Sequence, residues 1–110
     1  MKLQNLLEHR RSVRLFNDKR SIPPNDVEDC LRQATLAPTS SNMQLWQFIH
    51  LVDSSWRDGL TKACLGQKAA STATQWVVFV TRQDFFQSRA KFLLNFEILN
   101  IKRNNLKDKQ

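Results

Sequence analysis

Residues 36–48, LAPTSSNMQLWQF, join the end of an amphipathic helix to an apolar strand through a short turn. Pro38 ends the helix, because a residue that precedes proline is disfavoured in the helical region of backbone space. The six residues Thr39–Gln44, called the polar turn below, are uncharged, and five of them carry a hydroxyl or an amide. This stretch predicts that helices and strands both contribute to the fold.

Two interpretations of the polar turn follow from its composition. Serine, threonine and asparagine commonly satisfy the backbone of connecting loops and cap helices, so an ordinary connector is the simpler interpretation. The same hydroxyl and amide groups also suit a hydrogen-bonding edge over a neutral, planar ligand that carries alternating donors and acceptors. The segments on either side of the turn are needed to choose between them.

Hydrophobic periodicity predicts the elements around the polar turn. The second strand is a continuous apolar run, which indicates a sheet covered on both faces. The two strands are separated by a helix, and whether they pair directly stays open. The prediction comprises helices over residues 3–10, from an entry at 21–26 to residue 37, from 54 to a stop at Gly66, and from 83 onward, with strands over 45–52 and 76–81.

The last predicted helix has a wider apolar face than the helix that ends before Pro38. The last helix adds Phe85, Phe92 and Phe96 to its stripe, which is more than a solvent-exposed helix needs. Part of this surface is therefore expected to meet another chain or a missing segment. The helix that ends before Pro38 has one stripe, expected to be buried, of Val27, Cys30, Leu31, Ala34 and Ala37.

Several classes of protein are argued against by composition. No apolar run reaches eighteen residues, and the N-terminus lacks the features of a signal peptide, so neither a membrane span nor export is expected. Cys30 and Cys64 have no metal-ligand spacing and fall at apolar positions, which predicts two buried free thiols and a cytoplasmic location. His50 has no catalytic partner in sequence and is interpreted as a structural, hydrogen-bonded histidine.

The net charge of +7 is confined to the two ends of the chain. Residues 2–20 have a net charge of +4 and residues 102–110 a net charge of +3, whereas the residues between them are balanced. A duplex-binding protein normally clusters its lysines and arginines along one element. A small basic nucleic-acid-binding module is therefore kept only as an alternative.

Arg10, Arg11, Ser12 and Arg14 make a basic cluster, called the arginine segment (residues 10–14) below. Arginine's planar fork pairs with two phosphate oxygens, and a serine hydroxyl adds a further donor, so the cluster is a candidate phosphate site. A solvated basic turn is the simpler interpretation. Apolar residues within 13–16 interleave with the charges and are expected to hold the segment partly against the core.

Three separated segments together resemble the FMN-dependent nitroreductase family. Residues 10–16, RRSVRLF, resemble its R-R-S-x-R-x-F signature, and residues 34–46, ATLAPTSSNMQLW, are close to its A-x-x-A-P-S/T-S-x-N-x-Q-P-W motif. The third segment is Gly-Gln-Lys at 66–68 with the small residues and the apolar strand that follow. Leu45 departs from the pattern, because the family usually has proline there, and this implies a less stiff turn.

The resemblance implies an α+β fold with helices packed around a central sheet, and a homodimer with FMN at the subunit interface. It implies hydride transfer from NAD(P)H through the flavin to a small-molecule acceptor such as a nitro compound or quinone, without a catalytic side chain or a metal. The implied cofactor-binding residues are Arg10, Arg11, Ser12 and Arg14 for the phosphate and ribityl chain, Pro38, Thr39, Ser40 and Asn42 for a flavin held mainly by the other subunit, and Gln67 for the flavin side of the site.

Members of this family are roughly twice as long as this chain of 110 residues. The resemblance therefore implies that residues 1–110 are a single, incomplete, truncated domain that lacks the C-terminal half of the fold. Weak or absent FMN binding is expected if this is the whole chain, since its apolar faces would lack their cover. An inactive remnant of the family is a second alternative.

Overall fold

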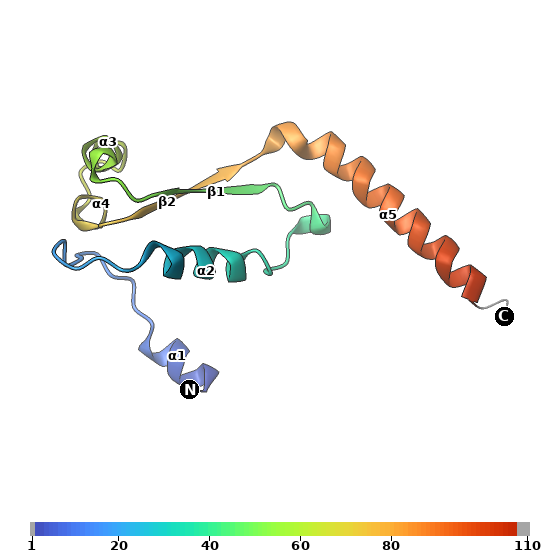
Figure 1. The fold of residues 1–110 in the computed structure, drawn as a ribbon, viewed down its shortest axis with the longest axis horizontal. Helices are drawn as coiled ribbons and strands as arrows, with labels where there is room; N and C mark the ends of the chain where they lie inside the picture. Colours follow the sequence, from blue (N-terminus) through green and yellow to red (C-terminus); the bar gives the residue numbers. More distant parts are fainter. Residues whose placement is uncertain (1, 108–110) are drawn as a thin grey trace. The chain divides into compact units, whose positions relative to one another are not determined.

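The computed structural model describes the backbone of residues 2–107 and the side chains of residues 2–103. Each helix and strand expected from the periodicity is present, and one further short helix precedes the second strand (Figure 1). The elements are α1 (Leu3–His9), α2 (Pro24–Ala34), a 3-10 turn (Ser40–Asn42), β1 (Trp46–Leu51), a 3-10 turn (Ser54–Trp56), α3 (Arg57–Ala63), α4 (Lys68–Thr72), β2 (Trp76–Thr81), a 3-10 turn (Gln83–Phe85) and α5 (Phe86–Lys107).

The two strands pair directly and antiparallel, which answers the question that the sequence left open. The Arg82 backbone N–H, just after β2, donates to the carbonyl of Leu45, just before β1. The prediction of a sheet covered on both faces is wrong for the described residues, because this sheet has two strands and Phe79 is 74% exposed. A two-stranded ribbon is marginally stable alone, so it depends on the helices attached to it.

The chain divides into two compact units. The first unit comprises the chain up to Val27 together with His50–Val77, and the second comprises Glu28–Ile49 together with the chain from Val78 onward. Each unit therefore contains part of α2 and part of both strands. The first unit holds the arginine segment, and the second holds the polar turn.

Helices α3 and α4 pack together in the first unit, where Ala70 of α4 is 9% exposed. Asp53 accepts a hydrogen bond from the Ser55 N–H at 2.9 Å, as expected of a cap. Gly66 ends α3 as predicted, because its φ of +73° suits glycine and its N–H reaches the Thr61 carbonyl at 2.8 Å. Local sequence signals therefore place both ends of this helical region correctly.

The loop that follows the arginine segment is tied to the end of α4 and the start of β2. The Phe16 N–H donates to Thr72 Oγ1 at 2.9 Å, and Gln75 Nε2 donates to the Ile22 carbonyl at 2.5 Å. The other end of the Gln75 amide accepts from His50 Nε2 at 2.7 Å, which confirms the structural interpretation of His50. One glutamine thus joins the loop, β1 and β2 within the first unit.

Helix α2 ends at Ala34, three residues before its predicted end. The N–H groups of Leu36 and Ala37 bond to carbonyls three residues earlier, at 3.1 Å each, so the chain tightens into turns before Pro38. The predicted buried stripe is also wrong, because Val27 and Leu31 are half-buried while Cys30, Ala34 and Ala37 are exposed. Apolar spacing identifies the inward side of a helix but does not supply the chain that covers it.

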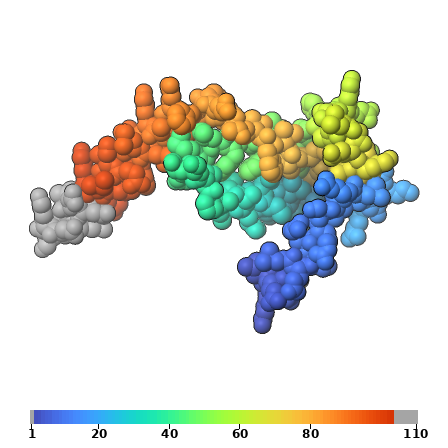
Figure 2. Space-filling view, turned by 180° about the vertical axis from the view of Figure 1, so that it is seen from behind, coloured from blue at the N-terminus to red at the C-terminus, as the bar shows by residue number. Residues whose placement is uncertain are grey.

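Helix α5 has a wide exposed apolar surface, as the sequence indicates, and its residues (orange to red) lie along the visible face in Figure 2. The large apolar side chains of α5 that are exposed are Phe86, Phe92, Leu94, Phe96, Ile98, Leu99 and Ile101.

The two cysteines lie outside α5. Cys30 and Cys64 are free and exposed, so the prediction of buried thiols is wrong.

Candidate functional site

The polar turn is closed by its own first residue. The Asn42 N–H donates to the Thr39 carbonyl at 3.0 Å, and the Met43 N–H donates to the Ser40 carbonyl at 3.1 Å. The Gln44 N–H then donates to the Thr39 side-chain oxygen at 3.2 Å. Thr39 therefore accepts hydrogen bonds through both its carbonyl and its hydroxyl, and it sets the curvature of the turn.

Three residues of the polar turn have left-handed backbone conformations: Ser41 at φ 50°, Asn42 at φ 53° and Gln44 at φ 52°. Asparagine tolerates this region, but serine and glutamine do so at a cost. Residues in such conformations cost about 1–3 kcal/mol each, and they cluster where a surrounding structure fixes them for binding or catalysis. Their concentration here favours the ligand-binding interpretation of the turn over the simple connector.

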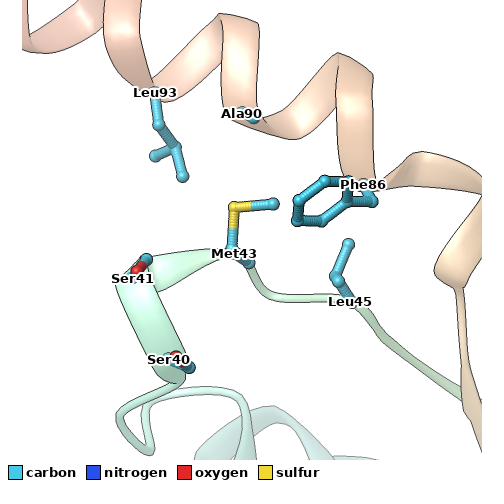
Figure 3. A pocket seen from close by; sticks show the side chains of 7 residues that line it. All are labelled: Ser40, Ser41, Met43, Leu45, Phe86, Ala90 and Leu93. Carbon is cyan, nitrogen blue, oxygen red and sulfur yellow. The ribbon is translucent and has the colours of Figure 1, made fainter.

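A pocket of about 520 Å³ lies between the polar turn and the first turns of α5, within the second unit (Figure 3). The side chain of Met43 extends toward the ring of Phe86, and Leu93 points from α5 into the same space. Ser40 and Ser41 stand on the opposite wall and supply the polar atoms of a largely apolar hollow. The lining residues are Ser40, Ser41, Met43, Leu45, Phe86, Ala90 and Leu93.

Arg82 lies where β2 leads into α5. Its Nε and Nη2 atoms donate to the two carboxylate oxygens of Asp84 at 2.9 and 2.7 Å, and its Nη1 donates to Gln47 Oε1 at 2.8 Å. The guanidinium carbon is 3.9 Å from the centre of the Phe85 ring. The hydrogen bonds from Arg82 lower the pKa of the Asp84 carboxyl below its ordinary value, and the same pairing raises the pKa of Arg82.

The arginine segment is held by local contacts. Arg11 Nη1 donates to the carbonyls of Glu8 and Arg10 at 2.6 and 2.8 Å, and Arg10 Nη1 reaches the Ser12 hydroxyl at 3.4 Å. Among the described residues, no carboxylate pairs with Arg10, Arg11 or Arg14. All three side chains are exposed, so their charge is available to an anion.

The expectation that apolar residues hold the arginine segment against the core is met only in part. Val13 and Leu15 are exposed, and so is Phe16, although the Phe16 backbone N–H is bound to Thr72. The tether is therefore a backbone hydrogen bond rather than buried apolar surface.

Gln67 stands at the N-terminal boundary of α4. Its N–H donates to the Cys64 carbonyl at 3.2 Å, and its carbonyl accepts from Ala70 and Ser71 at 3.1 and 3.2 Å. Its side chain makes no capping hydrogen bond to the helix. The backbone of Gln67 therefore has a structural role, while its exposed amide is left to other partners.

The nine predicted cofactor-binding residues fall into both units, and their roles as ligands stay predictions. Thr39, Ser40 and Asn42 are brought together in one closed turn that Pro38 precedes. Reasoning from the sequence did not single out Arg82. The available signal was its position, because it follows the end of a predicted strand and stands two residues before Asp84. Within the described residues, no group of three or more histidine, cysteine or acidic side chains could hold a metal ion, and no helix is long and apolar enough to cross a membrane.

The family model described as "Nitroreductase family" matches residues 7–109, which include both the arginine segment and the polar turn. The chain belongs to the nitroreductase family. A curated relative from Archaeoglobus fulgidus, described as "Putative NADH dehydrogenase/NAD(P)H nitroreductase", is 36% identical over 70 residues, which are 63% of this chain and 40% of the relative.

Solved structures of nitroreductase-like proteins share the fold. A nitroreductase-like protein from Streptococcus mutans aligns with a TM-score of 0.66 and 20% identity over 96% of this chain and 60% of its own. A protein from Exiguobacterium sibiricum, described as a "putative nitroreductase" and solved in complex with FMN, aligns with a TM-score of 0.69 and 22% identity over 100% of this chain and 53% of its own. A protein from Staphylococcus epidermidis, described as a "putative NAD(P)H:FMN oxidoreductase", aligns with a TM-score of 0.69 and 18% identity over 96% of this chain and 53% of its own.

This member of the nitroreductase family therefore spans about half the length of the proteins that it matches. The expected α+β fold is confirmed, as a mixture of helices with a small antiparallel sheet.

Proposed function

We propose that this chain supplies a phosphate-binding arginine segment and a flavin-facing polar turn to an FMN-dependent oxidoreductase. The reaction is hydride transfer from NAD(P)H to a small acceptor such as a nitro compound or a quinone. The observation that carries the proposal is the polar turn, an uncharged hydroxyl and amide surface held in a left-handed conformation. The proposal is supported by the family and by relatives whose descriptions include FMN and NAD(P)H.

The arginine segment fits the phosphate of FMN by its chemistry. A phosphate dianion requires several donors that carry positive charge, and charge-assisted hydrogen bonds from arginine are stronger than neutral ones. Arg10 and Arg14 are exposed and unpaired with any carboxylate of the described chain, and the Ser12 hydroxyl lies beside Arg10. Arg11 is already engaged with two backbone carbonyls, so Arg10 and Arg14 are assigned the larger share of the binding.

The polar turn fits a neutral ring system better than it fits an anion. Thr39, Ser40 and Asn42 offer donors and acceptors without charge, which suits the alternating polar edge of a flavin. Pro38 adds an apolar contact and removes a backbone donor beside the ring. When bound, FMN supplies the acceptance and onward transfer of the hydride. The chain's own residues bind its phosphate, orient its ring, and restrict the access of water.

We also propose that the protein acts as a homodimer in the cytoplasm, with the flavin at the subunit interface. The exposed apolar side chains of α5 support a partner that covers them. The two free cysteines agree with a reducing compartment.

Titration of the purified chain with FMN tests the proposal, with quenching of flavin fluorescence as the readout of binding. A ligand that binds only the folded chain must raise its melting temperature, so thermal melting with and without FMN gives a second, independent readout. The expected result is weak but saturable binding together with a higher melting temperature, because the chain spans only about half the length of its relatives. A folded chain that takes up no FMN at concentrations up to about 1 mM would contradict the proposal.

A further inference from the structure

We propose that Arg82 is a positioning residue that fixes the polar turn relative to the start of α5, so that the turn is preformed for its ligand. This inference rests on the proposed function for the identity of that ligand, but the positioning itself is a property of the flavin-free chain. Arg82 and the three side chains around it, Gln47, Asp84 and Phe85, are called the Arg82 cluster. All four belong to the second unit.

The Arg82 cluster connects two segments that are far apart in the sequence. On one side, the Arg82 backbone N–H donates to the Leu45 carbonyl and its Nη1 donates to Gln47 Oε1 at 2.8 Å. On the other side, its Nε and Nη2 bind both oxygens of Asp84 at 2.9 and 2.7 Å, while its guanidinium stacks on Phe85. The backbone of Arg82 therefore binds the exit of the polar turn, while its side chain joins Gln47 of β1 to the residues that lead into α5.

The contacts of Arg82 lie next to the residues that line the pocket. Leu45 directly follows the polar turn and itself lines the pocket in Figure 3, and Phe86 of the other wall directly follows Phe85. Both walls therefore lie beside a residue that Arg82 contacts. Leucine at position 45 leaves its backbone φ free, whereas proline would have fixed it. The hydrogen bond from Arg82 to the Leu45 carbonyl restrains the chain at this point.

The left-handed residues of the polar turn need such a restraint. Unfavourable backbone conformations persist only where the surrounding structure determines them more than once. Thr39 holds the turn from within, through its bond to the Gln44 N–H at 3.2 Å. The backbone N–H of Arg82 holds Leu45, the residue after Gln44, from outside, so the two attachments enclose the strained part of the chain. The side chain of Arg82 fixes that backbone through its contacts with Gln47, Asp84 and Phe85.

A purely structural ion pair is the alternative role for Arg82. Exposed arginine–carboxylate pairs contribute little to stability, and Arg32–Asp29 on α2, at 3.1 Å and with side chains 77% and 61% exposed, is an example in this chain. The Arg82 side chain is only 29% exposed and combines a two-pronged carboxylate contact, an amide and a ring. This combination of contacts requires the planar guanidinium group of arginine, and the ammonium group of lysine cannot reproduce it.

Amide hydrogen exchange of the chain of residues 1–110 without flavin tests the inference. The readout is the exchange rate of the Asn42, Met43 and Gln44 amides, whose N–H groups are hydrogen-bonded in the turn. Arg82→Ala keeps the backbone bond to Leu45 but removes the side-chain links to Gln47, Asp84 and Phe85 that hold this backbone in place. We therefore expect the three turn amides to exchange about tenfold faster or more. Arg82→Lys keeps the charge without the fork and should give a smaller acceleration.

Two further variants separate positioning from general stability. Arg32→Ala removes an arginine from an exposed pair and should leave the exchange of the turn unchanged. Gln47→Leu removes only the side-chain link to β1 and should accelerate the turn amides, even if Arg82→Ala does not fold. Equal acceleration of the turn and of the α3 amides in the first unit would overturn the inference, as would unchanged exchange of the turn in a folded Arg82→Ala or Gln47→Leu chain.

The same variants distinguish this inference from the proposed function. If the natural chain binds no FMN but Arg82→Ala still accelerates the turn amides, the proposed ligand is wrong and the positioning role stands. If the natural chain binds FMN and the turn exchanges at the same rate in Arg82→Ala, the positioning role alone is wrong. Where both hold, the visible circular dichroism of bound flavin should change in Arg82→Ala, because the turn would meet the ring in more than one geometry.

Discussion

The arginine segment and the polar turn are held in different ways. The guanidinium of Arg11 binds carbonyls at the end of α1, and the other arginines of the segment stand exposed without carboxylate partners in the described chain. The polar turn is closed by Thr39, strained at three residues, and attached to Arg82 at its exit. One region offers exposed charge, and the other offers a fixed backbone shape.

This difference matches what the two ends of a flavin mononucleotide would require. Attraction between a phosphate and several arginines acts over a distance and tolerates small displacements of either group. Recognition of a flat neutral ring depends on hydrogen bonds whose strength falls steeply with angle, so its partners must be fixed beforehand. The comparison therefore predicts large effects of charge removal in the first region and effects of geometry in the second.

The largest effect is expected from the double variant Arg10→Ala/Arg14→Ala. Each lost charge-assisted hydrogen bond to phosphate is worth about 1.5–3 kcal/mol, so we expect FMN affinity to fall by about 100-fold or more. Fluorescence titration with FMN at constant ionic strength measures the change in affinity. Arg32→Ala removes one arginine from α2 and is the control for net charge. Affinity that is unchanged in the double variant would mean that the phosphate is bound elsewhere.

A smaller effect is expected from Thr39→Val, which keeps the shape of the side chain and removes its oxygen. The Gln44 N–H then loses its acceptor at 3.2 Å, and we expect FMN affinity to fall about tenfold because an unmade hydrogen bond costs about 1–3 kcal/mol. Thr39→Ser retains the hydroxyl and should restore most of the affinity. If valine and serine behave alike in the titration, the hydroxyl does not shape the turn.

Ser41→Gly tests the strain itself. Glycine adopts the observed φ of 50° without a steric cost, so we expect unfolding free energy to rise by about 0.5–1 kcal/mol, after allowance for the greater entropy of the unfolded chain. Urea denaturation measures the change. Ser40 has no such φ, and Ser40→Gly should lower stability instead. A loss of stability in both variants would show that the turn is not strained at position 41.

The smallest effect concerns pH. The carboxyl of Asp84 has its pKa lowered by Arg82, so its contribution to stability is fully present above its unfolded pKa and is lost as pH falls through the lower folded value. The melting temperature of the natural chain should therefore decrease more on acidification below about pH 4 than that of Asp84→Asn. Equal pH dependence in the two chains would mean that the pair is formed only weakly in solution.

Local signals in the sequence predicted the elements well, while burial was predicted poorly. Gly66 acts through its own backbone and nearest neighbours, and its role as helix stop is confirmed. The exposure of Cys30 and Cys64 depends on which other segments cover their helices, which helical spacing does not encode. Sequence reasoning therefore identified the correct family and strands but overestimated the core.

The candidate site divides in the same way. Motif spacing singled out the arginine segment and the polar turn, although their roles as ligands remain to be tested. Arg82 escaped notice because its partner Gln47 is separated from it by 35 positions, and only the pairing of β1 with β2 brings them together. The left-handed conformation of Ser41 and Gln44 also had no signal, since neither residue type favours it.

The small core has a consequence for how the chain should melt. Ala70 is the only buried apolar residue among residues 2–103, so unfolding exposes less new apolar surface than in a chain of this length with a buried core. Because the heat capacity of unfolding and the denaturant m-value both scale with that surface, both should be low for a chain of this length. The thermal transition should consequently be broad, and any partner that covers α5 should make it steeper as well as shift it to higher temperature.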